Sequence, residues 1–454
     1  MVPARRPNLV FSVDVKTCIG EADLVFIAVN TPTKSSGIGA GAATDLAAFE
    51  TVGHDIARHA RPHTIVVEKS TVPCRTAELV QDILAANRPE VHLDVVLNPE
   101  FLAAGTAVKD LLHPDRIPIG PSTQTASGRR AASALANIYK TWVPRERVIG
   151  MHVWSAELAK VVANAMLAQR ISSINSISAI CEATCADLEE VAEAVGSDTR
   201  IGKAFLKAGI GFGGSCLKKD VLNLVYLAES LGLSHVAEYW QNVVNVNTHQ
   251  LDRFLRRIVC CLNNSLANKK ITILGFAFKA DTSDVRESPT LDMIQKLRAE
   301  HPLEIAIFDP CCNLALIRRE IETMVADGCC PPDVVVYSDI YQACATSNAV
   351  LIMTECNKFK LSPYPDSRPY TFSVNHQQYV SEPSCAEDCP DCELIQTRGQ
   401  PAAAYGIGDT VNWREISYHM KQPKWLFNRK GVINHVHMAQ LGFQVESIGR
   451  PKRL

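Results

Sequence analysis

The first third of the chain alternates short apolar runs with stretches at helical spacing. Three runs predict buried strands that end in polar loop residues: "ADLVFIAVNTP" (22–32), "HTIVVEKSTVP" (63–73) and "LDVVLNPEF" (93–101). The segments 45–60 and 75–87 between them predict helices. Strands that alternate with helices build a parallel sheet, whose ligands bind at the carboxyl ends of the strands. The loops "VNTPT", "KSTVP" and "NPEF" stand at such ends, so we expect a ligand site there.

The middle of the chain is predicted to be helical. From Ser155 to about Leu266 apolar residues recur at helical spacing, first in "SAELAKVVANAMLAQRISSINSISAICEAT". A second helical region starts near Lys219 and continues through "NVVNVNTHQLDRFLRRIVCCL". A long helix that is apolar on more than one face packs between domains or at a subunit contact. We therefore expect a helical core that joins both domains and subunits.

The alternation of strands and helices returns in the last part of the chain. Further strands are predicted in "KKITILGFAFKADTSDVRES" (269–288), "LEIAIFDP" (303–310) and "NAVLIMTEC" (348–356). The expected fold class is α/β, with two parallel-sheet domains joined by long helices and the first domain incomplete. The expected domains are 1–150, 151–266 and 267–454.

Residues 361–410 interrupt this pattern because they have no periodicity of either kind. A structureless insert of that length is unusual inside a compact domain. Its Cys385, Cys389 and Cys392 have no fourth ligand at zinc-finger spacing. We therefore expect no metal site.

The composition adds mainly exclusions. The 454 residues are 47% apolar and 21% charged, as is typical of a globular protein, and the net charge is −2. This charge gives no reason to expect nucleic acid or a membrane surface as a partner. No apolar run reaches the roughly 18 residues of a membrane-spanning helix, and no secretory signal is evident. The 16 cysteines are scattered, so free thiols and a cytoplasmic location are expected.

The segment "KAGIGFGGSCLKKD" (207–220) supports two interpretations. Gly209, Gly211 and Gly214 match the dinucleotide fingerprint G-x-G-x-x-G. That fingerprint needs a strand directly before it, whereas "TRIGKAFLKAG" predicts a helix, so we interpret the match as coincidence. Another Gly-rich segment, "SSGIGAGAATD" (35–45), lacks the last glycine of the fingerprint and predicts a flexible surface loop.

The second interpretation of this segment is a loop built around a nucleophile, Cys216. Lys218, Lys219 and a helix N-terminus beside the thiol would favour the reactive thiolate. The glycines would allow the backbone to approach a substrate closely. From the residues alone, an inert buried cysteine explains the segment equally well.

Other candidate polar residues lie at the ends of predicted strands or on the first long helix. Lys160 and Asn164 are four residues apart and share a helix face, where Lys160 either reaches a cavity or extends to the surface. Glu100 ends a predicted strand, where it serves either a ligand or a salt bridge. Ser70 and Thr71 could simply begin a helix.

Taken together, several stretches resemble the UDP-glucose 6-dehydrogenases, members of the UDP-glucose/GDP-mannose dehydrogenase family, and most closely the animal enzymes. They are "EADLVFIAVNTPTK", "VVEKSTVP", "NPEFLAAGTAVKDL", "WSAELAKVVANAMLAQRISSINSISAICEAT", "GFGGSCLKKDVLNLVYL" and "ILGFAFKADTSDVRES". The resemblance runs from about Asn8 to Lys360 and again from about Asn412 to Gly449. It implies an NAD-binding domain, a helical dimerisation core of a homo-oligomer and a UDP-binding domain. It also implies a four-electron oxidation of UDP-glucose to UDP-glucuronate with two NAD.

The resemblance also implies a role for each matching residue. Cys216 would capture the C6 aldehyde as a thiohemiacetal that becomes a thioester. The other implied catalytic residues are Lys160 and Asn164 at the C6 oxyanion, Asp220 and Thr71 at a catalytic water, and Glu100 as acid and base. The implied NAD site comprises Val29, Asn30, Thr31, Pro32, Thr33, Ser70, Thr71, Val72, Cys216, Lys219 and Arg286. The implied UDP-sugar site comprises Glu100, Phe101, Leu102, Ala103, Lys160, Asn164, Arg200, Lys207, Gly211, Phe212, Gly213 and Lys279.

The sequence departs from the family pattern in several places. Residues 1–20 contain neither the first strand with its Gly-rich turn nor the acidic residue that follows it. Ala104 replaces a family acidic residue, and Lys430 stands near a substrate arginine, whose paired contacts a lysine reproduces poorly. We therefore predict an incomplete or mis-spliced gene product, or a degenerate paralogue, with an intact nucleotide-sugar site and a crippled NAD site.

Three hypotheses follow. The first is an active UDP-glucose 6-dehydrogenase. The second is a catalytically impaired relative that still binds UDP-sugars or assembles with active subunits. The third is a family member that oxidises UDP-N-acetylmannosamine or GDP-mannose, against which the stretches "ILGFAFKADT" and "WSAELAK" argue.

Overall fold

The chain forms two compact units. The computed structural model describes residues 8–324, 331, 333–360, 411–429 and 432–450. The first unit consists of Met1–Cys260, Ala277–Met293 and Ile448–Leu454, and the second of Cys261–Phe276 and Ile294–Ser447. The predicted insert 361–410 with its three cysteines, and Lys430, lie outside the described residues. The division into three domains stays a prediction.

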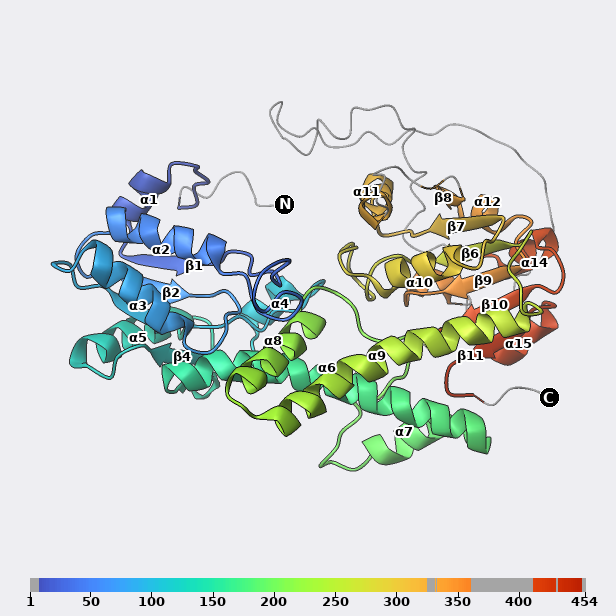
Figure 1. Cartoon of the computed structure of the whole chain (residues 1–454), viewed down its shortest axis with the longest axis horizontal. Coiled ribbons are helices and arrows are strands. Elements are labelled where there is room, and N and C mark those ends of the chain that lie inside the picture. Colours follow the sequence, from blue (N-terminus) through green and yellow to red (C-terminus); the bar gives the residue numbers. More distant parts are fainter. Residues whose placement is uncertain (1–7, 325–330, 332, 361–410, 430–431, 451–454) are drawn as a thin grey trace. The chain divides into compact units, whose positions relative to one another are not determined.

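The first unit is built on a five-stranded sheet in the order β1-β2-β3-β4-β5 (Figure 1). The strands are β1 (Leu24–Ile27), β2 (Ile65–Glu68), β3 (Asp94–Leu97), β4 (Ile117–Pro121) and β5 (Val148–Gly150). β1 to β3 are parallel, as predicted, whereas β4 is antiparallel to β3 and β5 is parallel to β4. The carboxyl ends of β1–β3 therefore share one edge of the sheet, and those of β4 and β5 lie at the opposite edge.

Helices cover both faces of this sheet because neighbouring strand residues point to opposite sides. Val66 and Val95 pack against α2 (Ala47–His59) and α3 (Thr76–Asn87), which confirms the two predicted helices. Val67 and Val96 pack against α5 (Ala126–Tyr139) on the other face. The short helices α1 (Val15–Glu21) and α4 (Ala107–Leu112) complete this part of the unit.

Long helices make up the rest of the first unit. They are α6 (Val153–Thr184), α7 (Leu188–Gly196), α8 (Leu217–Ser230) and α9 (Ser234–Cys261). The second predicted helical region is thus two helices, separated where Gly232 takes a φ of +70°. The helix predicted over "TRIGKAFLKAG" is wrong. This segment forms turns, because Gly202 and Phe205 take φ values of +72° and +63° that an α-helix does not allow.

The second unit is built on a parallel six-stranded sheet in the order β11-β10-β9-β6-β7-β8. Its strands are β6 (Lys270–Leu274), β7 (Glu304–Phe308), β8 (Val334–Val336), β9 (Ala349–Ile352), β10 (Trp425–Asn428) and β11 (Gln444–Ser447). Its helices are α10 (Pro289–Arg298), α11 (Leu314–Met324), α12 (Ile340–Cys344), α14 (Trp413–His419) and α15 (His435–Gln440). The predicted strands β6, β7 and β9 are confirmed, and both units have the parallel-sheet architecture of Rossmann-like domains.

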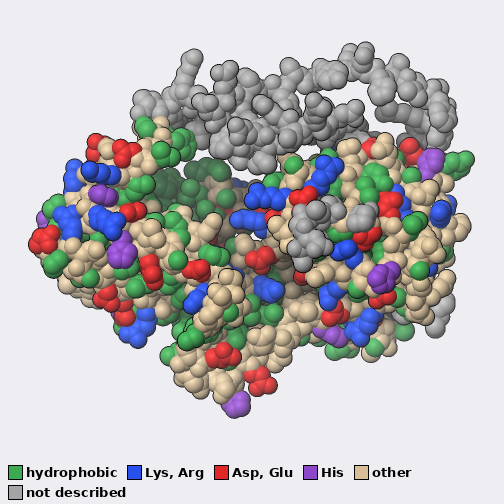
Figure 2. Space-filling view, turned by 45° about the horizontal axis from the view of Figure 1, so that its top comes forward, with side chains coloured by type: hydrophobic (Ala, Val, Ile, Leu, Met, Phe, Trp, Pro, Cys, Tyr) green, Lys and Arg blue, Asp and Glu red, His purple; other side chains and the backbone are tan. Residues whose placement is uncertain are grey.

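The described surface mixes charges of both signs. Figure 2 shows Lys and Arg side chains interspersed with Asp and Glu on the face that it draws, in line with the net charge of −2. Among the described residues, none of the helices is long and apolar enough to cross a membrane. The same residues contain no group of three His, Cys, Asp or Glu side chains that could hold a metal ion.

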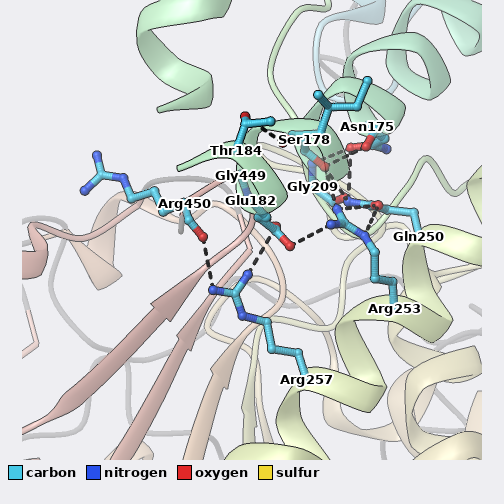
Figure 3. A network of polar contacts seen from close by, with 11 residues as sticks. Asn175, Ser178, Glu182, Thr184, Gly209, Gln250, Arg253, Arg257, Gly449 and Arg450 are labelled. Carbon is cyan, nitrogen blue, oxygen red and sulfur yellow. Dashed lines mark hydrogen bonds and ion pairs between the residues drawn. The ribbon is translucent and has the colours of Figure 1, made fainter. Parts of the chain in front are cut away.

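A polar network in the first unit holds the chain segment at Gly449 against α6 and α9 (Figure 3). Glu182 on α6 forms ion pairs with Arg253 at 2.6 Å and with Arg257 at 3.1 Å. The same carboxylate accepts a hydrogen bond from Gly449 N at 2.8 Å. Arg257 also donates to the carbonyl oxygen of Arg450 at 3.1 Å. One carboxylate therefore neutralises two arginines and fixes a third segment of the chain.

We expect Glu182→Gln to destabilise the first unit by roughly 3 kcal/mol, because removing one partner leaves two poorly compensated cations. Glu182 is only 18% exposed at its side chain. The matched control is Glu189→Gln: Glu189 pairs with Arg450 at 2.8 Å but is 63% exposed, so its loss should cost less than about 1 kcal/mol. Urea unfolding followed by circular dichroism measures both, and equal losses would contradict the role of the network.

Candidate active site

The loops after β1 and β2 are joined at the carboxyl edge of the first sheet. Ser70 Oγ accepts a hydrogen bond from Val29 N and donates one to Val29 O, both at 2.8 Å. Thr31 Oγ1 donates to Thr71 O at 2.8 Å. α3 begins only at Thr76, so the alternative that Ser70 and Thr71 start a helix is wrong. The predicted residues 29–33 and 70–72 are therefore brought together in one structure.

Lys160 and Glu100 form an ion pair at the same edge. Lys160 Nζ on α6 lies 3.2 Å from Glu100 Oε1, which follows β3. Lys160 is 4% exposed, so it does not extend to the surface. Its amine also lies 5.1 Å from the centre of the Phe101 ring. Glu100 Oε2 accepts a hydrogen bond from Leu102 N at 2.6 Å, which fixes its orientation. The salt bridge considered for Glu100 is thus present, and its partner is the lysine of the candidate site.

One helical turn further along α6, a second polar pair joins α6 to α8. Asn164 Nδ2 donates to Asp220 Oδ2 at 2.6 Å. Asp220 is 1% exposed, and its Oδ1 lies 3.7 Å from Lys219 Nζ. Lys219 in turn donates to Thr31 O at 3.1 Å. The first turn of α8 is thereby tied both to α6 and to the loop after β1.

Cys216 stands at the start of α8. It is the residue before Leu217, the first residue of the helix, which confirms the predicted helix N-terminus. Cys216 is exposed, so the alternative of a buried cysteine is wrong, and its role as a nucleophile stays a prediction. Its carbonyl oxygen accepts a hydrogen bond from Asp220 N at 3.0 Å. The thiol therefore lies one turn from the buried carboxylate of the Asn164 pair.

The loop before Cys216 needs its glycines. Gly211 takes a φ of +120°, and a Cβ there would lie 2.6 Å from Asn247 Oδ1. Asn247 on α9 accepts from Phe212 N at 2.7 Å and donates to Phe212 O at 3.1 Å. A Cβ on Gly213 would lie 2.2 Å from the Pro289 ring, and one on Gly214 would lie 2.8 Å from the Phe278 ring. Close packing on three sides therefore explains these glycines, and no strand precedes them as a dinucleotide fingerprint requires.

The remaining predicted residues lie around this centre at different depths. A Cβ on Gly105, in the loop after β3, would lie 2.2 Å from Asp281 O, so this loop touches the segment that carries Lys279. Arg286 pairs with Asp284 in its own loop at 2.7 Å. Arg200 pairs with Asp198 at 2.6 Å and is 87% exposed at its side chain. Ala103 N donates to Asp110 Oδ2 at 2.9 Å, and Lys207 is exposed. The loop of Ala103 and the segments that carry Lys279 and Arg286 contact the site, since Gly214 N also donates to Glu287 O at 3.0 Å.

Burial shifts the proton affinity of several groups at this edge. It raises the pKa of Asp220 above its usual range, and the nearby Lys219 opposes the shift. Burial also raises the pKa of Glu157 and, most strongly, that of Glu68, the last residue of β2. It lowers the pKa of Lys69 to about 8, a shift that the charge of Glu100 opposes. Burial thus makes these carboxylic acids weaker acids and makes Lys69 a weaker base.

Sequence reasoning missed two residues that shape the site. Lys69 Nζ donates to Asn98 Oδ1 at 2.9 Å and to Tyr139 OH at 3.1 Å. It lies close enough to Glu100 and Lys160 for their charges to affect its pKa. Its signal was a lysine placed directly after a buried strand. Asn247 gave less warning, since it is one amide within the polar run "NVNTHQ" of α9.

Three family models match consecutive parts of the chain. Residues 2–143 match the NAD binding domain of the UDP-glucose/GDP-mannose dehydrogenase family, residues 154–249 its central domain and residues 272–372 its UDP binding domain. Two Rossmann-like α/β units in one chain form an architecture that is common among nucleotide-binding proteins.

Similar proteins lead to the same family. The chain is 41% identical to UDP-glucose 6-dehydrogenase 1 of Arabidopsis thaliana, over 98% of this chain and 85% of the relative. It is 43% identical to UDP-glucose 6-dehydrogenase of Bos taurus, over 98% of this chain and 81% of the relative. A UDP-glucose dehydrogenase structure from Pyrobaculum islandicum has a TM-score of 0.66 at 32% identity, covering 76% of this chain and 74% of that one. The chain belongs to the UDP-glucose/GDP-mannose dehydrogenase family, and the special likeness to animal enzymes stays a prediction.

NAD is the cofactor of the family domain that residues 2–143 match. The loops after β1 and β2 offer hydroxyl and backbone groups at the ligand edge, which fits one part of a dinucleotide. A pyrophosphate group is usually held by a glycine-rich turn from a strand into a helix. Within residues 8–150 the glycine-rich connection is the one from β1 to α2, but its Gly37, Gly39 and Gly41 stand about ten residues after the strand rather than in a turn directly after it. The described residues thus fit the group in part.

We expect Glu68→Gln to remove a pH-dependent loss of stability. Glu68 is fully buried, and neither carboxylate oxygen accepts a hydrogen bond within the described part of the chain. Because its folded pKa lies above the unfolded value near 4.5, the native chain should lose stability as pH rises from that value toward the folded pKa. The advantage of the variant should grow by about 1.4 kcal/mol per pH unit in that window.

Urea unfolding at several pH values between 5 and 8 measures this difference. The control is Glu50→Gln, since Glu50 is exposed on α2. The difference in the free energy of unfolding between Glu68→Gln and the native chain should change with pH. If it stays constant, the Glu68 carboxyl group ionises in the folded chain as easily as in the unfolded chain.

Proposed function

We propose that this chain catalyses the NAD-dependent four-electron oxidation of UDP-glucose to UDP-glucuronate. The observation that carries this proposal is the ion pair of the buried Lys160 with the half-buried Glu100, beside the Asn164–Asp220 pair and the exposed Cys216. An amine, three amide or carboxyl groups and a thiol at one ligand edge supply what a two-step alcohol oxidation needs. The identity of 41% to 43% with relatives named UDP-glucose 6-dehydrogenase supports the substrate.

In the first oxidation the C6 alcohol loses a hydride and a proton to become an aldehyde. Bound NAD supplies the hydride acceptor in both oxidations. Lys160 stabilises the negative charge that develops on the C6 oxygen, and Asn164 is the second group that contacts this oxygen. Because Lys160 is nearly free of water, this stabilisation acts in a low-dielectric surrounding, where it is strongest. Glu100, held at 3.2 Å from the amine, fixes its position.

In the second oxidation Cys216 forms a covalent bond with the aldehyde carbon. The resulting thiohemiacetal loses a hydride and a proton and becomes a thioester. Water then adds to the thioester carbon and expels the Cys216 thiolate, which restores the enzyme. The sum is UDP-glucose, two NAD⁺ and water converted into UDP-glucuronate, two NADH and three protons.

Acidic side chains near the thioester assist its hydrolysis by water. Asp220 is buried and Asn164 holds its Oδ2 at 2.6 Å, so its carboxyl group is in a fixed position to orient the attacking water. Its backbone N–H already contacts the Cys216 carbonyl group, which places it within one helical turn of the thiol. We assign the positioning of the water to Asp220 and Thr71, and proton exchange to Glu100.

The UDP part is assigned to the loop of Gly211, Phe212 and Gly213 together with Lys207, Lys279 and Arg200. Cationic side chains and backbone N–H groups suit a diphosphate. The assembly of a homo-oligomer through the central helices and a cytoplasmic location are part of the same proposal. UDP-N-acetylmannosamine and GDP-mannose are the substrates that a competition assay must exclude.

We expect Cys216→Ser to lower the rate of NADH formation by roughly 1,000-fold or more, because the second oxidation loses its nucleophile. The controls are Cys185→Ser and Cys260→Ser, which alter two other exposed free cysteines and should leave the rate unchanged. NADH absorbance with purified chain, UDP-glucose and NAD gives the rate. Two NADH per UDP-glucose are expected from the native chain. A purified chain that binds UDP-glucose but forms no NADH would instead favour the impaired relative.

We expect Lys160→Met to lower kcat by roughly 100- to 1,000-fold, because the variant keeps much of the side-chain volume but loses the charge at the C6 oxygen. The control is Lys34→Met, because Lys34 lies in the loop after β1 and donates to a neighbouring backbone carbonyl group. Steady-state kinetics with UDP-glucose separates kcat from KM. A Lys160→Met variant that raises only KM would assign Lys160 to binding rather than to the transition state.

A further inference from the structure

A groove lies between α5 and the edge strand β5, next to the start of α6. It encloses about 550 Å³, which is within the size range of sites for small organic ligands. Its floor is apolar and is formed by Ile119, Pro121, Ala132, Ala136, Val148 and Met151. Within the part of the chain that the structure describes, β5 pairs only with β4, so the groove follows an edge of the sheet that no other described strand covers.

The rim of the groove is positively charged. Arg129 and Lys140 come from one side of α5, and Arg145 comes from the turn before β5. His152, which precedes α6, adds an imidazole, and Gln124 and Ser133 add neutral polar groups. None of the lining residues is an Asp or Glu. A rim of three cations in a chain of net charge −2 is therefore a local concentration of positive charge.

Within the protein these cations form at most local hydrogen bonds to neutral groups. Arg129 donates to the carbonyl oxygen of Gln124, and Lys140 donates to Asn137 Oδ1 at 3.4 Å. Neither of them, nor Arg145, forms an ion pair with a carboxylate in the described part of the chain. By contrast the neighbouring Arg147 is used structurally, since it donates to Pro114 O at 3.0 Å. Three guanidinium and ammonium groups that share one groove without counter-ions fit an anionic ligand.

The groove is separate from the candidate active site. The carboxyl ends of β4 and β5 lie at the sheet edge opposite to those of β1–β3. α6 connects the two edges, because it starts after His152 and carries Lys160 eight residues later. At 1.5 Å per residue this separation is about 12 Å along the helix. A ligand in the groove would thus sit at the origin of the helix that positions the buried lysine.

We propose that this groove is a second binding site, which takes an organic phosphate of about nucleotide size. The cations hold the phosphate and the apolar floor holds the uncharged part of the ligand. The groove does not depend on the proposed dehydrogenase reaction, since it shares none of its residues.

The experiment titrates AMP into the full chain by calorimetry, with UDP-glucose and NADH present at saturation to occupy the candidate active site. We expect saturable binding that weakens as salt concentration rises. The double variant Arg129→Gln/Lys140→Gln should weaken this binding at least about tenfold, since two charge-assisted contacts are lost. The matched control is Arg130→Gln, an exposed arginine next to Arg129 that does not line the groove.

Both altered positions are exposed, so the double variant should keep the circular dichroism spectrum and thermal midpoint of the native chain. Weaker binding in the double variant alone supports the site. The proposal is overturned if AMP shows no saturable binding, if the double variant binds as the native chain does, or if Arg130→Gln weakens binding equally. The result is separate from the dehydrogenase assay, because no turnover is measured.

Discussion

The first unit is organised around one buried amine. Lys160 lies on a long helix that crosses the sheet, and it can remain at 4% exposure only because Glu100 meets it at 3.2 Å from the end of β3. For a charged amine without such a partner, the desolvation penalty would exceed the stabilisation gained from packing. The ion pair therefore fixes the register of α6 on the sheet. The positions of the later α6 residues depend on this register, including that of Asn164 in its contact with Asp220.

From this pair the polar contacts continue across three elements. Asp220 joins α6 to α8, Lys219 joins α8 to the loop after β1, and Thr31 joins that loop to the one after β2. Each contact links segments far apart in the sequence, so the ligand edge is rigid although it consists of loops. The low water access that makes these contacts strong also shifts the pKa values of Asp220 and Lys69 toward neutrality. Stability and chemistry thus have the same physical origin in this site.

α6 also gives the unit two further functions. Near its C-terminal end, α6 carries Glu182, which forms ion pairs with two arginines of α9 and accepts a hydrogen bond from Gly449 N. Its beginning follows the groove whose cations have no internal counter-ions. One helix thereby connects a stabilising network, a candidate active site and a candidate anion site.

The sequence alone determined the parallel strands β1–β3, the helices that separate them and the loops that follow them, because apolar periodicity and strand-end residues are local signals. It also singled out Lys160 and Cys216, whose surroundings in the chain are unusual for their side chains. Local pattern failed over 199–209, where the positive φ values of Gly202 and Phe205 replace the predicted helix by turns. Only the tertiary structure paired Lys160 with Glu100 and showed why Gly211 must lack a Cβ, since Asn247 approaches it from α9. Such pairings join residues separated by dozens of positions, and no local periodicity encodes the distance between them.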